Sequence, residues 1–203
     1  MGLTARKPEG SDIEPVEAGG HQGICIRYYD LGTQYMEMFS TAARKVLLMW
    51  ELPDERIEIN GKDLPRAISK EYTLSLHKKA NLRNDLESWR GKKFTDKELE
   101  GFDLDNILAK NCTLNVIHNE KGYAQVAAVM PLMKNMTKKQ PENQIEYFSF
   151  DDGKIEIPEN TPEWIAKKIK NSDEWAAFIN PEYDREPALD EKPPPPDDDE
   201  IPF

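Results

Sequence analysis

The chain has few cysteines and no long apolar run. Only two cysteines, Cys25 and Cys112, occur among its 203 residues. They lie far apart, each in an apolar stretch, which indicates reduced thiols in a protein core rather than a disulfide framework. The longest apolar run, Val46 to Trp50, is too short to cross a membrane, and residues 1–20 hold no apolar signal core. We therefore expect a cytoplasmic protein without a membrane partner.

Recognisable catalytic and metal-binding motifs are also missing. The candidate metal ligands match neither a Cys-x-x-Cys nor a His-Glu-x-x-His spacing; they are His21, Cys25, His77, Cys112 and His118. No Gly-rich phosphate loop occurs, no Ser/His/Asp or Cys/His group lies close in sequence, and the carboxylates are not spaced as in a metal-dependent nuclease. We expect no metal and no cofactor, and a protein that is not an enzyme; a zinc site and a nuclease are the less favoured alternatives.

Positive charge is scarce overall, but the shortage is local. The formal net charge is −11. Residues 1–140 hold 21 Lys and Arg against 20 Asp and Glu, a balance of +1, whereas residues 141–203 hold 6 against 18, a balance of −12. A nearly neutral body can still bind phosphate through local basic clusters, because counterion release depends on local contacts. Nucleic acid is therefore not excluded as a partner.

What the chain does contain is a regular succession of strand patterns interrupted by one helix. An apolar stripe of Leu82, Leu86 and Trp89 predicts the helix, and strands are expected at residues 23–29, 45–52, 70–77, 112–118 and 123–130. Three strands, a helix and two strands is the chain order of the OB-fold, a small Greek-key barrel. We predict a mainly β fold, with a five-stranded OB-fold barrel over residues 21–135 and a helix between strands 3 and 4.

Turn signals and helix starts complete this outline. Residues 54–69 are predicted to form a long turn or hairpin loop, and residues 119–122 a tight hairpin. Around the barrel we expect a flexible arm at 1–20, a connector with a short strand and helices at 136–180, and a disordered Pro-rich acidic tail at 181–203. The connector strand is expected at Tyr147, Phe148 and Phe150, and its helices are expected to start at Thr161-Pro162-Glu163 and Ser172-Asp173-Glu174.

Aromatic and basic residues accompany the first three predicted strands. Binding of single strands without sequence preference needs aromatic faces for the bases and cations for the phosphates. Alternation places Tyr28 on one face with Ile24 and Ile26, which favours a core position, and a core position is also favoured for Tyr72. Tyr29 is predicted on the opposite face with Cys25 and Arg27, where ligand contact is favoured. Trp50 suits either role. The predicted DNA-binding residues are Arg27, Tyr29, Tyr35, Arg44, Lys45, Trp50, Lys70 and Lys78.

The chain ends in a run of acids followed by a short apolar plug. Pro193 to Pro196 favour a stiff, extended spacer, and the residues after it are Asp197, Asp198, Asp199, Glu200, Ile201, Pro202 and Phe203. A phenyl ring can fill an apolar pocket on a partner, while the acids and the terminal carboxylate meet its cations. An ordinary acidic tail is the less favoured interpretation.

These residues resemble a known family. The tip is similar to the acidic tip of bacterial and phage single-stranded DNA-binding proteins, which ends Asp-Asp-Asp-Ile-Pro-Phe; Glu200 is one inserted acid. The segments 44–53, 70–77 and 86–92 also resemble phage-encoded members. The long Gly/Gln-rich linker of the bacterial protein is missing, so its tetramer is not implied, although a homo-oligomer is left open.

The resemblance implies a protein of phage replication, recombination or repair in the host bacterial cytoplasm. It would coat and protect single-stranded DNA and recruit partner proteins of the helicase, nuclease, polymerase or recombinase class through residues 197–203. The alternative is a phage decoy that displays the tip to capture host replication or repair proteins and binds DNA weakly or not at all.

Overall fold

The computed structural model describes residues 14–36, 41–153 and 155–180. The predicted acidic tail and its tip, and most of the predicted N-terminal arm, lie outside these residues. In the described part of the chain no helix has the length and apolar character needed to cross a membrane.

The chain is mainly β, and the predicted succession of three strands, a helix and two strands is confirmed. The strands are β1 (Gly19–Met36), β2 (Thr41–Ile59), β3 (Lys62–Thr73), β4 (Asn111–His118), β5 (Ala124–Pro131) and β6 (Glu146–Phe148). The helices are α1 (Asn81–Arg90), α2 (Asp96–Glu100), α3 (Glu163–Lys170) and α4 (Asp173–Ile179), and short 3-10 turns are η2 (Leu104–Ile107) and η3 (Phe150–Asp152).

The strands form one sheet that does not close on itself. Its order is β3-β2-β1-β4-β5, and every neighbouring pair along this path is antiparallel. The connector strand β6 pairs in parallel with the middle of β1, from Arg27 to Tyr29. The predicted connector strand is thus confirmed at Tyr147 and Phe148, whereas Phe150 lies in η3. The sheet therefore holds the five predicted strands together with the predicted connector strand. Among the described residues its hydrogen-bonded path ends at β3 and at β5, so closure into the predicted barrel is not confirmed.

The predicted long loop at residues 54–69 is wrong, because β2 and β3 continue through it as a ribbon. Only Asn60 and Gly61 separate the two strands, and both have positive φ, 52° and 74°, as a type I′ turn requires. Arg56 on β2 pairs with Asp63 on β3 at 3.0 Å. The ribbon carries charged side chains and buries little, so its sequence lacks the clean alternation of a half-buried strand.

A bulge in β1 changes which side of the sheet its side chains face. The register with β2 shifts between Cys25 and Arg27, so Cys25 and Tyr28 share one apolar cluster while Ile26 and Tyr29 belong to a second. The predicted faces, with Ile26 beside Tyr28 and Cys25 beside Tyr29, are therefore wrong beyond the bulge. Such an extra residue reverses the alternation for every residue that follows it.

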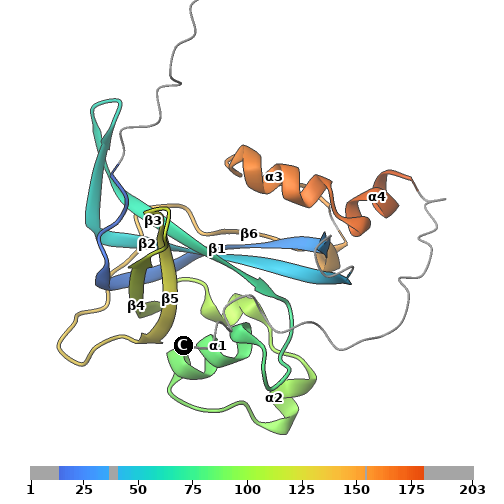
Figure 1. Ribbon diagram of the computed structural model, residues 1–203, viewed down its shortest axis with the longest axis horizontal. Helices are drawn as coiled ribbons and strands as arrows, with labels where there is room; N and C mark the ends of the chain where they lie inside the picture. The colour runs from blue at the N-terminus through green and yellow to red at the C-terminus, as the bar shows by residue number, and fades with distance from the viewer. Residues whose placement is uncertain (1–13, 37–40, 154, 181–203) are drawn as a thin grey trace, which may run out of the picture.

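The two apolar clusters lie on opposite sides of the sheet. Helix α1 covers one side and α3 with α4 covers the other (Figure 1). Ile165 and Ile169 of α3 are fully buried in the cluster with Ile26 of β1 and Leu47 of β2, whereas the neighbouring Trp164 is 48% exposed. The helix begins one residue later than predicted, with Pro162 as its N-cap, whereas Ser172 caps α4 as expected by accepting from the Trp175 N–H.

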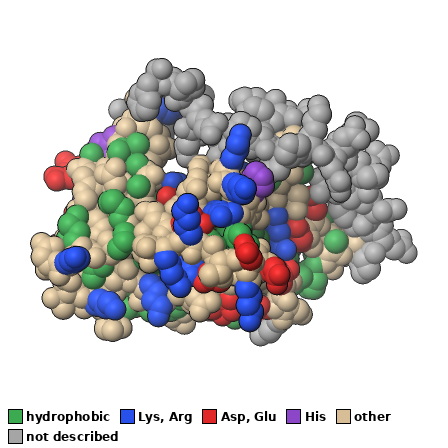
Figure 2. All heavy atoms as spheres, turned by 90° about the horizontal axis from the view of Figure 1, so that it is seen from below, with side chains coloured by type: hydrophobic (Ala, Val, Ile, Leu, Met, Phe, Trp, Pro, Cys, Tyr) green, Lys and Arg blue, Asp and Glu red, His purple; other side chains and the backbone are tan. Residues whose placement is uncertain are grey.

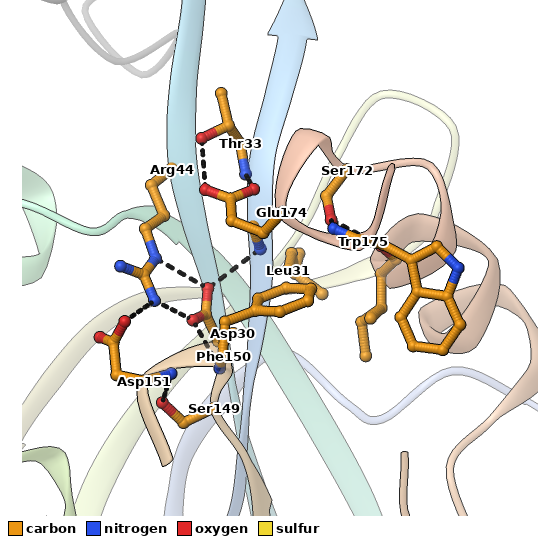
Figure 3. A network of polar contacts seen from close by, with 12 residues as sticks. Asp30, Leu31, Thr33, Arg44, Ser149, Phe150, Asp151, Ser172, Glu174 and Trp175 are labelled. Atoms are coloured by element: carbon orange, nitrogen blue, oxygen red, sulfur yellow. Dashed lines mark hydrogen bonds and ion pairs between the residues drawn. The ribbon is translucent and has the colours of Figure 1, made fainter. Parts of the chain in front are cut away.

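A polar network fastens this second layer to β1 (Figure 3). The buried Asp30 carboxylate accepts from the Arg44 guanidinium and from the backbone N–H groups of Gly32 and Phe150. Arg44 also reaches Asp151 at 2.9 Å, and the Glu174 carboxylate accepts from the Thr33 N–H and hydroxyl. The predicted connector is thus an integral layer of the fold.

Candidate nucleic-acid interface

Two of the predicted stacking aromatics are buried and cannot meet a base. Tyr29 and Trp50 are both 0% exposed. Tyr29 lies under the α3 layer with Ile26, and Trp50 packs in the inner core with its ring 6.3 Å from that of Trp89. The prediction for Tyr29 is wrong because residues more than a hundred positions later cover the outer face of β1. For Trp50 the core alternative is confirmed, as it is for Tyr28 and Tyr72.

Most of the predicted phosphate-binding cations already have protein partners. Arg27 lies 3.3 Å from the Glu146 carboxylate, and Lys70 lies 3.0 Å from that of Asp85. Lys45 donates to the Thr73 hydroxyl at 2.9 Å. Arg44 is engaged by Asp30 and Asp151, and its hydrogen bond with Asp30 is the main cause that raises its pKa further. These side chains bind other residues of the fold, so binding a phosphate would require each of them to leave its present protein partner.

The last two predicted DNA-binding residues are exposed but lie on separate elements. Tyr35, 62% exposed, is close to the end of β1, opposite Ala42 of β2. Lys78 is exposed in the turn between β3 and α1. The predicted residues therefore do not converge on one continuous surface.

The structure instead has a groove along the open edge between β3 and β5, which we call the seam groove. Its wider part has a volume of about 640 Å³ and lies between β3 and the β4–β5 hairpin; its lining includes Glu14, Val16, Arg66, Ile68, Lys121 and Tyr123. A narrower part of about 240 Å³ continues along the strands past Ser69, Lys70, Gln125 and Val126. Here the Lys70 ammonium reaches across to the Ala127 carbonyl at 3.5 Å.

The β4–β5 hairpin holds an aromatic ring and a cation at the rim of this groove. The Asn119 side-chain oxygen accepts from the backbone N–H groups of Lys121 and Tyr123, each at 3.0 Å. Gly122 has a φ of 79°, and its N–H donates to the Asn119 carbonyl at 2.8 Å, which confirms the predicted tight hairpin. Tyr123 is 66% exposed. An exposed aromatic on a fixed turn is a suitable platform for base stacking.

The N-terminal segment forms the other wall of the groove. Arg66 donates to the Glu14 carbonyl, and the His118 ring is 2.7 Å from the Val16 carbonyl. Arg66 and Lys121 line the wider part of the groove together with the acidic Glu14, and Glu71 is a second acidic residue in the lining of the narrower part. No pattern in the sequence groups Arg66, Lys121 and Tyr123; the signal that could have found them is the aromatic residue directly after the predicted hairpin.

No group of three potential metal ligands occurs among the residues that the structure describes. Burial raises the pKa of both thiols, Cys25 and Cys112, so neither is arranged as a thiolate ligand or nucleophile. No protein-family model matches this chain, and no curated protein matches it.

Proposed function

We propose that the chain is a single-stranded DNA-binding protein of the OB type, with the seam groove as its binding surface. The observation that carries the proposal is the position of this groove in the strand order. The order β3-β2-β1-β4-β5 is that of an OB barrel opened between β3 and β5, and OB-folds are often only partly closed.

The location of the groove supports this interpretation. OB-folds bind oligonucleotides over strands 2 and 3 and with the loops that join strands 1–2 and 4–5. The seam groove is bordered by β3 and by the β4–β5 hairpin, two of those elements.

The side chains of the groove suit a single strand without regard to its sequence. Tyr123 offers an exposed ring to a base, Ile68 offers an apolar floor, and Lys121 and Arg66 can meet phosphates. Base stacking on an aromatic side chain is worth about 1–3 kcal/mol and tolerates every base. Neutralising a few phosphates adds affinity that falls as salt rises.

The C-terminal tip supplies the second half of the proposal, which is recruitment. Residues 197–203 lie outside the described part of the structure, and the role of these residues rests on the sequence alone. We propose that they bind replication or recombination proteins while the seam groove holds DNA. A protein that displays the tip but does not bind DNA would be the decoy, which is the alternative function.

A titration of fluorescein-labelled oligothymidine at two salt concentrations tests the proposal. We expect binding that weakens with salt and a preference for single-stranded over double-stranded DNA. Tyr123→Ala should weaken binding about tenfold, because it removes a stacking ring, whereas the matched variant Tyr35→Ala, which removes an equally exposed ring on another element, should change the affinity less than twofold.

The results that contradict the proposal are distinct. Undetectable binding at low salt would refute DNA binding and favour the decoy. Binding that falls with Tyr35→Ala and not with Tyr123→Ala would keep the function but move the interface to the β1–β2 end of the sheet.

A further inference from the structure

A second cleft lies at the other end of β4, between α1 and η2. We call it the α1–η2 cleft; its volume is about 580 Å³, and its lining includes Trp89, Arg90, Lys92, Phe102, Ile107 and Lys110. Lys110 directly precedes β4, whereas Lys121 of the seam groove follows it. A strand of that length spans about 25 Å, so the two cavities are separate sites.

The charges of this cleft favour an anion. Three cationic residues, Arg90, Lys92 and Lys110, line the cleft together with two acidic ones, Glu98 and Asp103. Both carboxylates are already engaged: Glu98 pairs with Arg90, and Asp103 accepts from the Asp105 N–H at 2.9 Å. The Lys92 side chain is 65% exposed, and its ion pair with Glu98 is long, with 3.9 Å between the ammonium and the nearest carboxylate oxygen. Lys110 is also exposed. Both lysines are therefore available to an incoming anion.

The carbonyl end of α1 also borders the cleft and would repel an anion if it were bare. It is capped: Gly91, with a φ of 67°, ends the helix, and the N–H groups of Gly91 and Lys92 donate to the Ser88 and Glu87 carbonyls. The capped end adds little negative potential to the cleft.

The remaining lining is aromatic, apolar and rigid. The Arg90 guanidinium lies over the rings of Phe94 and Phe102, at 4.5 and 5.1 Å from their centroids, and Phe94 meets Phe102 edge to face. The Trp89 indole N–H donates to the Asn111 carbonyl at 3.0 Å. Phe102 and Ile107 thus form a fixed apolar wall beside the cations. Figure 2 views the molecule from this side and shows Lys and Arg side chains spread over it.

A flat apolar wall next to paired cations matches the two halves of a nucleotide. We propose that the α1–η2 cleft binds a nucleoside 5′-monophosphate unit, with the phosphate between Lys92 and Lys110 and the base against Phe102 and Ile107. The cleft volume lies in the range of small-molecule sites. The Asn106 side-chain amide lies beside that wall, and its nitrogen donates a hydrogen bond to the Asp103 carbonyl at 2.9 Å. The unit is either a free nucleotide or the 5′-phosphorylated end of a strand.

Titration with thymidine 5′-monophosphate, followed by NMR of the tryptophan indole N–H signals, tests the site on the full chain. The Trp89 signal, assigned with a Trp89→Phe variant, should shift on binding, and thymidine without phosphate should shift it far less. Lys92→Ala combined with Lys110→Ala should weaken binding several-fold and at most about twenty-fivefold, because each exposed ion pair contributes up to about fivefold. The controls Lys97→Ala, an exposed cation on α2 outside the cleft, and Lys121→Ala should leave it unchanged.

Two further measurements separate the sources and the sites. The first compares the affinity for 5′-phosphorylated oligothymidine with that for 5′-hydroxyl oligothymidine. If the phosphorylated strand binds more tightly and the double variant abolishes this difference, the ligand is a strand end. If the two strands bind with equal affinity, the ligand is the free nucleotide. The proposal is overturned if the nucleotide causes no shift at millimolar concentration, or if the double variant binds it as the parent does. Because Lys121→Ala tests the seam groove, failure of either site is seen independently of the other.

Discussion

The buried carboxylate of Glu51 is expected to be a main link between β2 and the chain that follows β5. It is 0% exposed, and its two oxygens accept from the Glu142 N–H, the Asn143 N–H and the Asn143 side-chain amide at 2.8 to 3.1 Å. Only one of these oxygens meets all three donors. In Glu51→Gln the amide oxygen can keep that position, but the amide nitrogen then faces the Glu142 N–H, 3.0 Å away in the parent.

The expected cost follows from these contacts. Hydrogen bonds to a charged acceptor contribute about 1.5–3 kcal/mol, against about 1 for neutral ones. In Glu51→Gln the two hydrogen bonds from Asn143 lose their charged acceptor, and the Glu142 N–H meets the amide nitrogen, which is also a donor. Together these changes should lower the free energy of unfolding by about 3 kcal/mol. Urea denaturation measures it, with Glu58→Gln, an exposed carboxylate on the same strand, as the matched control that should change stability by less than about 0.5 kcal/mol. A loss below about 1 kcal/mol for Glu51→Gln would refute the reasoning.

Two further predictions concern pH and the tail. Hydrogen bonds from the Thr95 backbone N–H and from Arg90 lower the pKa of Glu98 from 4.5 to about 2. The ionised carboxylate therefore contributes fully to stability above pH 4.5, and this contribution is lost as the pH falls toward 2. Glu98→Gln should make the thermal midpoint less dependent on pH in that interval, and an unchanged pH profile would contradict the assignment. Deleting residues 190–203 should tighten DNA binding a few-fold at low salt, because a tethered acidic tail competes with DNA for cations. Phe203→Ala keeps every acid, so it should leave DNA affinity unchanged and weaken partner binding at least tenfold; equal tightening by both changes would mean that the tip docks on its own chain.

Local patterns in the sequence predicted the elements that depend on neighbouring residues. The stripe of Leu82, Leu86 and Trp89 is the buried face of α1, and the Asn119 hairpin and the Ser172 cap form as their side chains dictate. Each of these features is decided within a few positions of the chain, which is the distance over which periodicity and capping rules apply.

The features that the sequence did not predict depend on contacts between distant segments. The bulge after Cys25 is decided by the register with β2, and the burial of Tyr29 by α3, which begins at Glu163. The seam groove likewise joins β3 to a hairpin about fifty residues later, so Arg66 and Tyr123 carry no common pattern. Which strands pair, and which helix buries a strand face, depends on the whole fold when the segments lie far apart in the sequence. The alternation of residues within one strand does not predict these contacts.

The position of β1 has a consequence for synthesis on the ribosome. Residues Arg27 to Tyr29 bond β2 on one edge and β6 on the other, and β6 leaves the ribosome more than a hundred residues after β1. Until then, a nascent chain that ends after β5 presents an unpaired strand edge beside the uncovered apolar side chains of Ile26 and Leu31, the kind of surface on which strands of separate molecules associate. A truncation at residue 135, the predicted end of the barrel, would make that transient surface permanent, so the shortest piece of this protein that keeps this strand edge paired and these side chains covered should extend through α3.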